Sequence, residues 1–254
     1  MTAPIFYVGL HQPADAKNFD RACISINRLR GRKSPVDCPD VLVDSGAFTE
    51  LARHGHYRHD VAEYAAELRR LHTAGVVRIT AAVAQDYMCE TFMVERTGLS
   101  IAEHQRLTIE RYDALVDALA GMPFPVMPVL QGYDPDDYTR HLDAYGDRLK
   151  PGMWVGVGSV CKRNGDPERI VEVVWPVHYR RPDLRLHGFG VKRTALLHPG
   201  VREMFATTDS MAWSHAERAK KSGKQNDWRQ AAAFVAHIGD ATGRAAEPWQ
   251  MPLL

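Results

Sequence analysis

The stretch ITAAVAQDYMCE, residues 79–90, indicates the fold class. Its first part, 79–85, is apolar along both faces, as expected of a strand buried inside a parallel sheet. This strand ends in Asp86, and no signal for a helix start follows it directly. A carboxylate in such a dry position is unfavourable, because burial penalises the charged form. Its presence therefore needs a chemical reason.

Six further runs have the same character and predict strands. They are 5–9, 41–45, 126–132, 154–160, 184–191 and 205–210. Two of them also contain an isolated acid near their end: Asp44 in VLVDSGAF and Asp209 in FATTDSMAW. Three acids in equivalent places predict one shared site.

Helical patterns lie between these strands and predict crossover connections. They cover 59–75, 100–121, 134–149 and 166–181. Ser100 and Glu103 form a capping box at the start of the second helix. Asp134 and Asp166 each precede a proline, which is typical of a helix cap followed by the first helical residue. Repeated alternation of strands and helices indicates a parallel sheet.

We predict an α/β fold of the TIM-like (β/α)8 barrel type rather than an open doubly wound sheet. Polar residues end nearly every strand, which is where barrel active sites are built. Only seven strands are clear, so the barrel is expected to be irregular. The prediction is one barrel domain over 1–254, with a basic helical segment at 214–254. GVGSVCKRNG, 156–165, lacks the glycine register of a dinucleotide-binding loop.

The charge pattern is more informative than the net charge, which is only +1. Basic clusters follow several predicted strands; each alone is typical of a solvated face, but together they suggest a track for phosphates. The predicted nucleic-acid contacts are Lys162, Arg163, Lys192, Arg193, Lys220, Lys221 and Lys224.

The cysteines indicate no zinc site. Cys23, Cys38, Cys89 and Cys161 show no metal-ligand spacing, so we predict no bound metal. The sequence has no apolar run long enough for a membrane span and no secretory signal. We therefore expect a soluble, cytoplasmic protein without membrane association.

The strand ends suggest chemistry on a sugar and a base, although each residue also has a structural explanation. Asp44 before Ser-Gly suits an Asx-turn, Asp209 suits a helix cap, and His187 alone suits a buried core histidine. Two carboxylates at one pocket suit displacement at an anomeric carbon. An acid beside an amide, such as Asp86 and Gln131, matches the hydrogen-bonding edge of guanine.

Six motifs in order resemble those of the tRNA-guanine transglycosylases. They are VLVDSGAF, AQDYMCE, VLQG, VGVGSV, LHGFGV and TTDSMAW, and the resemblance covers 40–215. It is closest to the DNA-modifying branch, the DpdA family of phages and bacterial islands. That branch exchanges guanine in DNA for a 7-deazaguanine base.

The resemblance implies roles for the strand-end acids. Asp209 corresponds to the nucleophile that attacks the sugar C1′, and Asp44 to the general acid/base. Phe48 and His187 correspond to the groups that sandwich the base. An acid in an apolar strand is then tolerable, because its charge is needed for the reaction.

The resemblance also implies how the base is read. Asp86 and Gln131 correspond to the pair that binds the guanine edge. The N–H of Gly158 corresponds to a second donor to the guanine carbonyl, and Ser159 lies near the 7-substituent.

One departure from the family of tRNA enzymes favours DNA as the partner. Those enzymes carry a zinc subdomain after the nucleophile, whereas residues 214–254 contain no cysteine. We therefore expect no structural zinc. The resemblance implies that no cofactor is needed, and that the incoming base is 7-cyano-7-deazaguanine or a relative. The resemblance allows a homodimer, and action in the host cytoplasm if a phage encodes the protein. Exchange in tRNA, sugar hydrolysis and base binding without catalysis are the alternatives.

Overall fold

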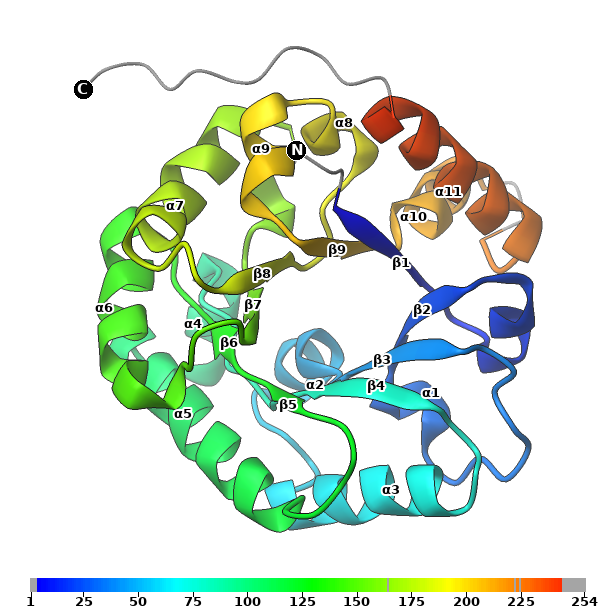
Figure 1. Ribbon diagram of the computed structural model, residues 1–254, viewed down its shortest axis with the longest axis horizontal. Helices are drawn as coiled ribbons and strands as arrows, with labels where there is room; N and C mark the ends of the chain where they lie inside the picture. Colours follow the sequence, from blue (N-terminus) through cyan, green and yellow to red (C-terminus); the bar gives the residue numbers. More distant parts are fainter. Residues whose placement is uncertain (1–3, 164, 222, 224, 244–254) are drawn as a thin grey trace.

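The protein is built around one parallel sheet that curls into a ring, with helices outside it (Figure 1). The computed structural model describes residues 4–163, 165–221, 223 and 225–243. The strand order is β5-β4-β3-β2-β1-β9-β8-β7-β6. The strands are β1 (Ile5–Gly9), β2 (Arg21–Ser25), β3 (Asp40–Asp44), β4 (Ile79–Val83), β5 (Val126–Met127), β6 (Val129–Leu130), β7 (Trp154–Val157), β8 (Arg185–Gly188) and β9 (Thr207–Ser210).

The ring closes through the short strands β5 and β6, which are two halves of one run. β5 pairs with β4 and β6 pairs with β7, and Pro128 separates them. Proline has no N–H for the ladder. Its carbonyl still accepts from the Gly156 N–H at 2.8 Å. If the run 126–130 is taken as one strand, the barrel has eight, and the predicted TIM-like fold is confirmed.

The strand missing from the sequence prediction is β2. It pairs in parallel with β1, where Val8 is opposite Ala22, and with β3, where Ser25 is opposite Asp44. Only the 3-10 helix η1 (Pro13–Asn18) lies between β1 and β2, so the strand–helix alternation is absent there. The prediction of seven clear strands therefore omitted one near the N-terminus.

The four predicted helices are confirmed. They are α3 (Val61–Thr73), α5 (Ile101–Ala118), α6 (Pro135–Tyr145) and α7 (Pro167–Arg180). The remaining α-helices are α1 (Ile26–Leu29), α2 (Ala47–His54), α4 (Thr91–Thr97), α8 (Arg193–Leu196), α9 (Pro199–Met204), α10 (Ala212–Ala219) and α11 (Trp228–Gly243). The Ser100 hydroxyl accepts from the Glu103 N–H at 3.2 Å, as expected of the capping box.

Side chains fill the barrel interior, as in other barrels of this type. One cluster lies inside the ring, and a larger core lies between the strands and the outer helices. The inner cluster consists of Tyr7, Cys23, Leu42, Ala81, Val83, Met127 and Val129, with Trp154 and Phe189 against it. Because side chains alternate along a strand, Asp44 shares the inward face with Leu42.

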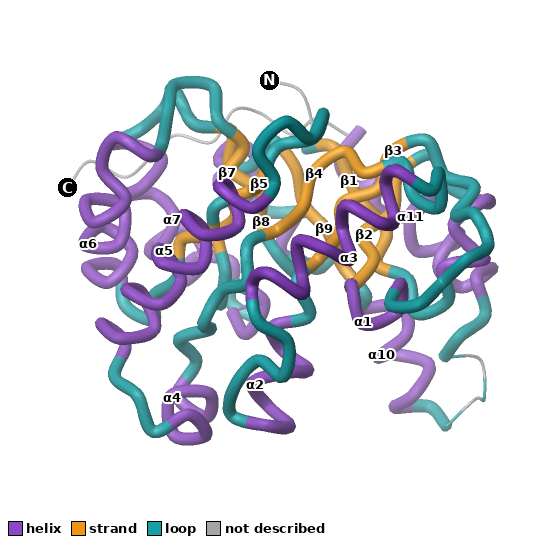
Figure 2. The backbone as a smooth tube through the Cα atoms, turned by 90° about the horizontal axis from the view of Figure 1, so that it is seen from below, coloured by secondary structure: helices purple, strands orange, loops and turns teal. Residues whose placement is uncertain are grey.

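Helices α2, α4 and α10 project beyond one end of the barrel (Figure 2). Each follows the carboxyl end of a strand, respectively β3, β4 and β9. We call this end the mouth. None of the described helices is both long and apolar enough to cross a membrane.

The assignment of β2 to the barrel can be tested with Ile24→Ala. Ile24 is fully buried in β2, so we expect the substitution to lower the free energy of unfolding by about 2–5 kcal/mol in urea titrations. Arg21→Ala on the same strand removes only an exposed ion pair with Asp40, so it is the control and should cost less than about 1 kcal/mol. Equal small effects would contradict a buried β2.

Candidate active site

Asp44 and Asp209 lie at the mouth and are electrostatic neighbours. Asp44 ends β3, and Asp209 lies in β9, opposite Tyr7 of β1. Cys23 of β2 lies close enough to both acids for their charges to affect its thiol. Burial raises the pKa of its thiol, and the negative charges of Asp209 and Asp44 raise it further. The barrel therefore brings two acids that are far apart in sequence to one place.

The pKa of Asp44 lies closer to neutral pH than that of an ordinary aspartate. Burial raises its pKa to about 6, and the charge of Asp209 contributes to the increase. Hydrogen bonds from the Gly46 N–H, at 2.9 Å, and from Ser25 oppose this effect. The Asx-turn considered above is thus present. It does not exclude catalysis, because a carboxyl with a pKa near the working pH suits proton transfer.

Asp209 is held by a loop that glycine makes possible. Its Oδ1 accepts from the Gly190 N–H at 2.9 Å. Gly190 has φ +67°, and a Cβ there would lie 2.7 Å from Cys161. The helix-cap explanation applies to the next residue instead, since Ser210 Oγ accepts from the Ala212 N–H at 3.2 Å. The carboxylate of Asp209 is therefore not used as a cap.

His187 lies away from the exposed surface of the mouth, and its expected role as a wall for the base stays a prediction. Its side chain is fully buried in the barrel interior, 4.6 Å from the Phe189 ring between centroids. Nδ1 shares a hydrogen bond with Thr207 Oγ1 at 2.8 Å, which leaves Nε2 facing Asp209 Oδ1 at 3.4 Å. A ring buried beside the acid is placed to orient it.

The predicted base-reading residues form one buried hydrogen-bonded chain. Gln131 Nε2 donates to Asp86 Oδ2, and the Ser159 hydroxyl donates to Gln131 Oε1 at 2.9 Å. Ser45 donates to the other oxygen of Asp86 at 3.2 Å. Burial raises the pKa of Asp86 to about 7, and the charge of Asp44 adds to the increase. Asp86 is thus coupled to Asp44, which is itself coupled to Asp209.

Gly158 has a different role from the expected one. Its N–H donates to the Leu130 carbonyl at 2.9 Å, so in this structure it is not directed to a ligand. A Cβ at this position would lie 2.1 Å from Gln131 Nε2. Glycine is therefore needed to leave space for the Gln131 amide.

Phe48 lies at the start of α2 and is 51% exposed. Its ring is 6.1 Å from that of Phe92, at the start of α4. Lys162 Nζ lies 5.5 Å from both ring centroids. Phe48 remains accessible to a base, unlike His187.

Several predicted phosphate contacts gather at the mouth. Burial lowers the pKa of His215, and the positive charges of Arg218, Lys192 and Lys162 lower it further. Two of the predicted contacts, Lys162 and Lys192, therefore lie within electrostatic reach of one residue of α10; Arg218 is a third cation there, which was not predicted.

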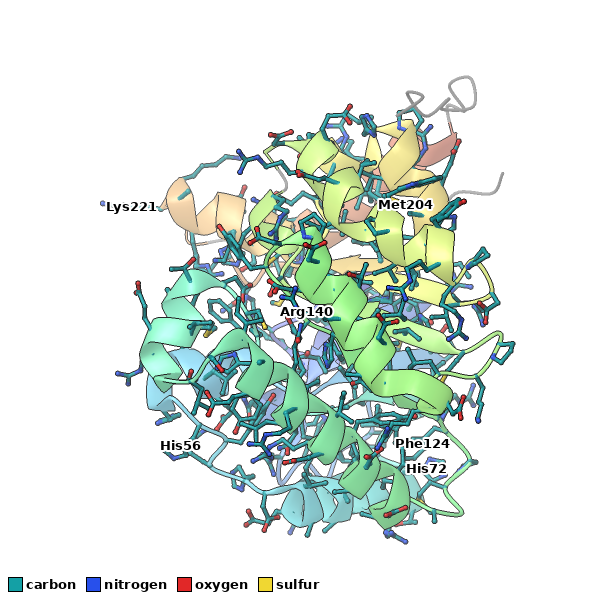
Figure 3. The ribbon with its side chains drawn as sticks, turned by 90° about the vertical axis from the view of Figure 1, so that its left-hand side faces the viewer. His56, His72, Phe124, Arg140, Met204 and Lys221 are labelled. Atoms are coloured by element: carbon teal, nitrogen blue, oxygen red, sulfur yellow. The ribbon has the colours of Figure 1, made fainter. Side chains whose placement is uncertain are left out.

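The remaining basic candidates are more dispersed. Arg193 begins α8, and Lys220 pairs with Glu217 at 3.1 Å. Lys221 lies toward the same side of the molecule as His56, opposite His72 and Phe124 (Figure 3). Lys224 lies outside the described residues.

Glu90 is a buried acid that the sequence analysis did not single out. Both of its carboxyl oxygens are buried, and within the described part of the chain neither has a hydrogen-bond partner. Burial raises its pKa, while the Ser159 hydroxyl and the charges of Lys162 and Arg163 partly oppose this. Its only signal in the sequence is its place four residues after Asp86.

The described residues contain no group of three or more His, Cys, Asp or Glu side chains placed to hold a metal ion. The polar side chains of Asp86, Gln131, Ser159 and Ser45 form hydrogen bonds with one another.

The fold and the mouth define a class of protein: a parallel barrel enzyme with coupled carboxyls at the carboxyl ends of its strands. The chain belongs to the DpdA family, described as DeoxyPurine in DNA protein A, which matches residues 3–233. No curated protein matches the chain. At the level of the family, membership implies a DNA 7-deazaguanine transglycosylase activity and DNA as the substrate partner.

Gly158→Ala tests the need for space beside Gln131. The new methyl group should displace the Gln131 amide, lowering guanine affinity about tenfold or more in calorimetric titrations. Loss of the buried hydrogen bonds should cost about 1–3 kcal/mol of stability. Gly165→Ala is the control, because a Cβ there has no atom within 4 Å. Unchanged guanine affinity in the Gly158 variant would contradict this role.

Asp86→Asn tests the raised pKa of the buried Asp86, of which burial is the main cause and the charge of Asp44 a further one. Because the folded-state pKa of Asp86 is raised to about 7, the folded state binds its proton more tightly than the unfolded state does. This contribution to stability is present at low pH and is lost as pH rises toward 7. The variant should therefore gain roughly 1–3 kcal/mol relative to the native protein between pH 4.5 and 8.

Thermal and urea unfolding at both pH values would measure this difference. Asp136→Asn, on the exposed surface of α6, is the matched control and should show no such change. A difference for Asp86→Asn that is independent of pH would refute the raised pKa of Asp86.

Proposed function

We propose that this protein exchanges guanine in DNA for a 7-deazaguanine base through a covalent bond between Asp209 and the sugar. The observation that carries this proposal is the coupling of Asp209, Asp44 and Asp86 at one barrel mouth, with Gln131 bound to the last of them. Two acids supply nucleophile and proton transfer, and the third supplies base recognition.

The first step breaks the bond between guanine and deoxyribose. The target nucleotide must first leave the base stack, at a cost of a few kcal/mol in intact duplex. The Asp209 carboxylate then attacks C1′ as the C1′–N9 bond breaks, and the bonding electrons pass to guanine. Asp44 gives its proton to the departing base; its raised pKa of about 6 leaves a protonated fraction for this purpose.

The second step reverses these roles with a new base. The 7-deazaguanine enters the pocket, and the Asp44 carboxylate removes the proton from its N9. N9 then attacks C1′, and Asp209 leaves as a carboxylate. Two inversions at C1′ retain the configuration, as in retaining glycoside hydrolysis. The exchange consumes no oxidant, reductant or nucleotide.

To bind a base in this proposal, the pocket must break the hydrogen bond between Gln131 and Asp86 and replace it with hydrogen bonds to the base. In the free protein the Gln131 amide donates to Asp86. A bound guanine would offer Asp86 its N1–H and amino group, while Gln131 would turn its N–H to the guanine carbonyl. Ser159 holds the oxygen of the Gln131 amide and so fixes which end faces the base.

His187 acts on the nucleophile rather than on the base in this proposal. With Nδ1 bonded to Thr207, its Nε2 faces the Asp209 oxygen that also accepts from Gly190. His187 and Gly190 together orient the carboxylate towards C1′. His187 is thus a positioning residue, and Phe48 is the exposed aromatic wall for the base.

The incoming base is expected to be 7-cyano-7-deazaguanine or a relative, as the resemblance implies. Basic side chains at the mouth would hold phosphates without reading sequence, so DNA affinity should fall steeply with salt. A homodimer remains compatible with this function.

Asp209→Asn tests the proposal. We expect loss of labelled guanine exchange into DNA by at least about 1,000-fold and no covalent adduct on denaturing gels, because an amide is a poor nucleophile. Asp136→Asn should retain both activities. A parallel assay on tRNA separates the two substrates. A covalent adduct at the normal level in Asp209→Asn would exclude Asp209 as the nucleophile.

A further inference from the structure

Three exposed aromatic side chains border the base pocket. Phe48, Phe92 and Tyr133 are 51%, 40% and 41% exposed. Phe48 and Phe92 lie at the starts of α2 and α4, two of the three helices that project at the mouth, and Tyr133 comes two residues after Gln131. We call these three residues the aromatic rim.

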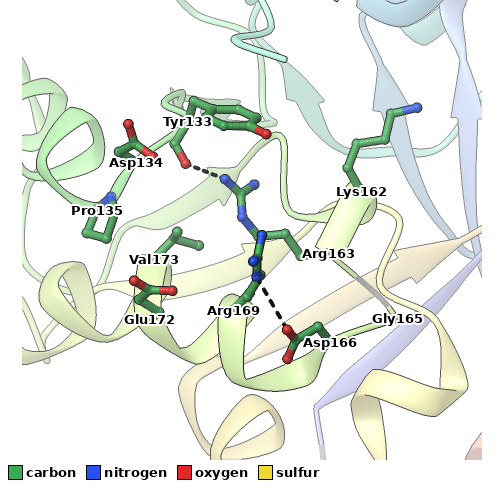
Figure 4. A pocket seen from close by; sticks show the side chains of 10 residues that line it. All are labelled: Tyr133, Asp134, Pro135, Lys162, Arg163, Gly165, Asp166, Arg169, Glu172 and Val173. Atoms are coloured by element: carbon green, nitrogen blue, oxygen red, sulfur yellow. Dashed lines mark hydrogen bonds and ion pairs between the residues drawn. The ribbon is translucent and has the colours of Figure 1, made fainter. Parts of the chain in front are cut away.

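Two cations lie on the aromatic rim. Lys162 Nζ is 5.5 Å from the centroids of both Phe48 and Phe92. The Arg163 guanidinium lies 4.9 Å over the Tyr133 ring. Figure 4 shows that Arg163 points to Tyr133 while Lys162 points away from it. Lys162 thus contacts the rings of Phe48 and Phe92, whereas Arg163 contacts the ring of Tyr133.

Arg163 also connects the rim to the base-reading chain. Its guanidinium donates to the Ser159 carbonyl at 2.7 Å and to the Tyr133 carbonyl. Ser159 in turn holds Gln131. The rim is therefore continuous with the pocket that the proposed function assigns to the target base.

A neighbouring hollow of about 510 Å³ is less suited to phosphate (Figure 4). Asp134, Asp166 and Glu172 line it beside the cations, and Arg169 is already paired with Asp166 at 3.3 Å. These acids repel a phosphate that enters the hollow. The rings and the cations over them are the more favourable contact for DNA.

We propose that Phe92 and Tyr133 of the aromatic rim, with Lys162 and Arg163, stack on the unpaired bases that flank the target guanine, so that the substrate is single-stranded or locally opened DNA. Phe48 stays the wall for the target base, as in the proposed function. This inference rests on the proposed function. Bases offer their faces to aromatic side chains only when they are unstacked, and such contacts combined with cations are the usual means of holding single strands. In an intact duplex the flanking faces are hidden.

Fluorescence anisotropy with labelled DNA tests the inference without requiring base exchange. A 12-nucleotide strand with one central guanine should bind at least about tenfold more tightly than its duplex. Phe92→Ala and Tyr133→Ala should each weaken single-strand binding about 5- to 20-fold, since stacking contributes about 1–3 kcal/mol per base. Both should change duplex binding less than twofold.

Tyr179→Ala is the matched control, because Tyr179 is 72% exposed on α7 and lies outside the rim. It should leave both affinities within twofold. Similar loss from this variant would show that the rim has no special role and would overturn the inference.

Abasic sites on both sides of the guanine separate stacking from charge. They remove the flanking bases but keep the phosphates, so the native protein should lose about tenfold in affinity. Phe92→Ala should lose clearly less on the same change, because its stacking contact is already absent. Equal losses in the two proteins, or equal affinity for single strand and duplex, would reject the proposal.

The outcome is independent of the test of the proposed function. Loss of stacking with normal exchange would reject the rim alone. Stacking on single strands without any exchange in the native protein would reject the transferase function but retain the rim as a binding surface.

Discussion

The burial of three coupled carboxyls at the mouth of a parallel barrel is the constraint on which the site depends. Buried charges are costly, and the low dielectric strengthens the repulsion among them. The protein reduces this cost by raising the pKa of Asp44 to about 6 and of Asp86 to about 7. The same shifts leave the acids able to exchange protons near neutral pH.

Two glycines, Gly158 and Gly190, allow the site side chains to take their positions, each for a different reason. At Gly158 the requirement is space, because the Gln131 amide occupies the place of a Cβ. At Gly190 the requirement is also conformational, since its φ of +67° directs its N–H to Asp209. Both glycines follow β7 or β8, where the chain leaves the barrel. The local backbone thus sets the position of the side chains that act.

The pocket and the surface around it differ in how their polar groups are satisfied. Inside, Asp86, Gln131 and Ser159 bind one another, so the proposed base would replace a protein hydrogen bond. Outside, Phe48, Phe92 and Tyr133 remain exposed. A substrate with both a polar edge and an aromatic face, such as an unstacked nucleotide, complements both regions. Membership of the DpdA family is consistent with this combination.

Much of the fold was readable because buried parallel strands are apolar throughout and their crossover helices carry caps. The strand β2 was missed since the 3-10 helix η1 replaces a full crossover before it. The surroundings of His187 and Gly158 could not be predicted for a different reason. A sequence shows that a residue follows a strand, but not which way its side chain or N–H points. His187 faces inward, and the Gly158 N–H belongs to the ladder.

The sequence alone determined the alternation of strands and helices, the three acids at strand ends and the order of motifs, because these depend on local periodicity and residue type. Only the tertiary structure decided which groups meet. The approach of Asp44 to Asp209, the chain from Asp86 to Ser159, and the rim of Phe92 and Tyr133 all join residues far apart in sequence. Such contacts arise from barrel closure and register, since these place distant strand ends around one axis.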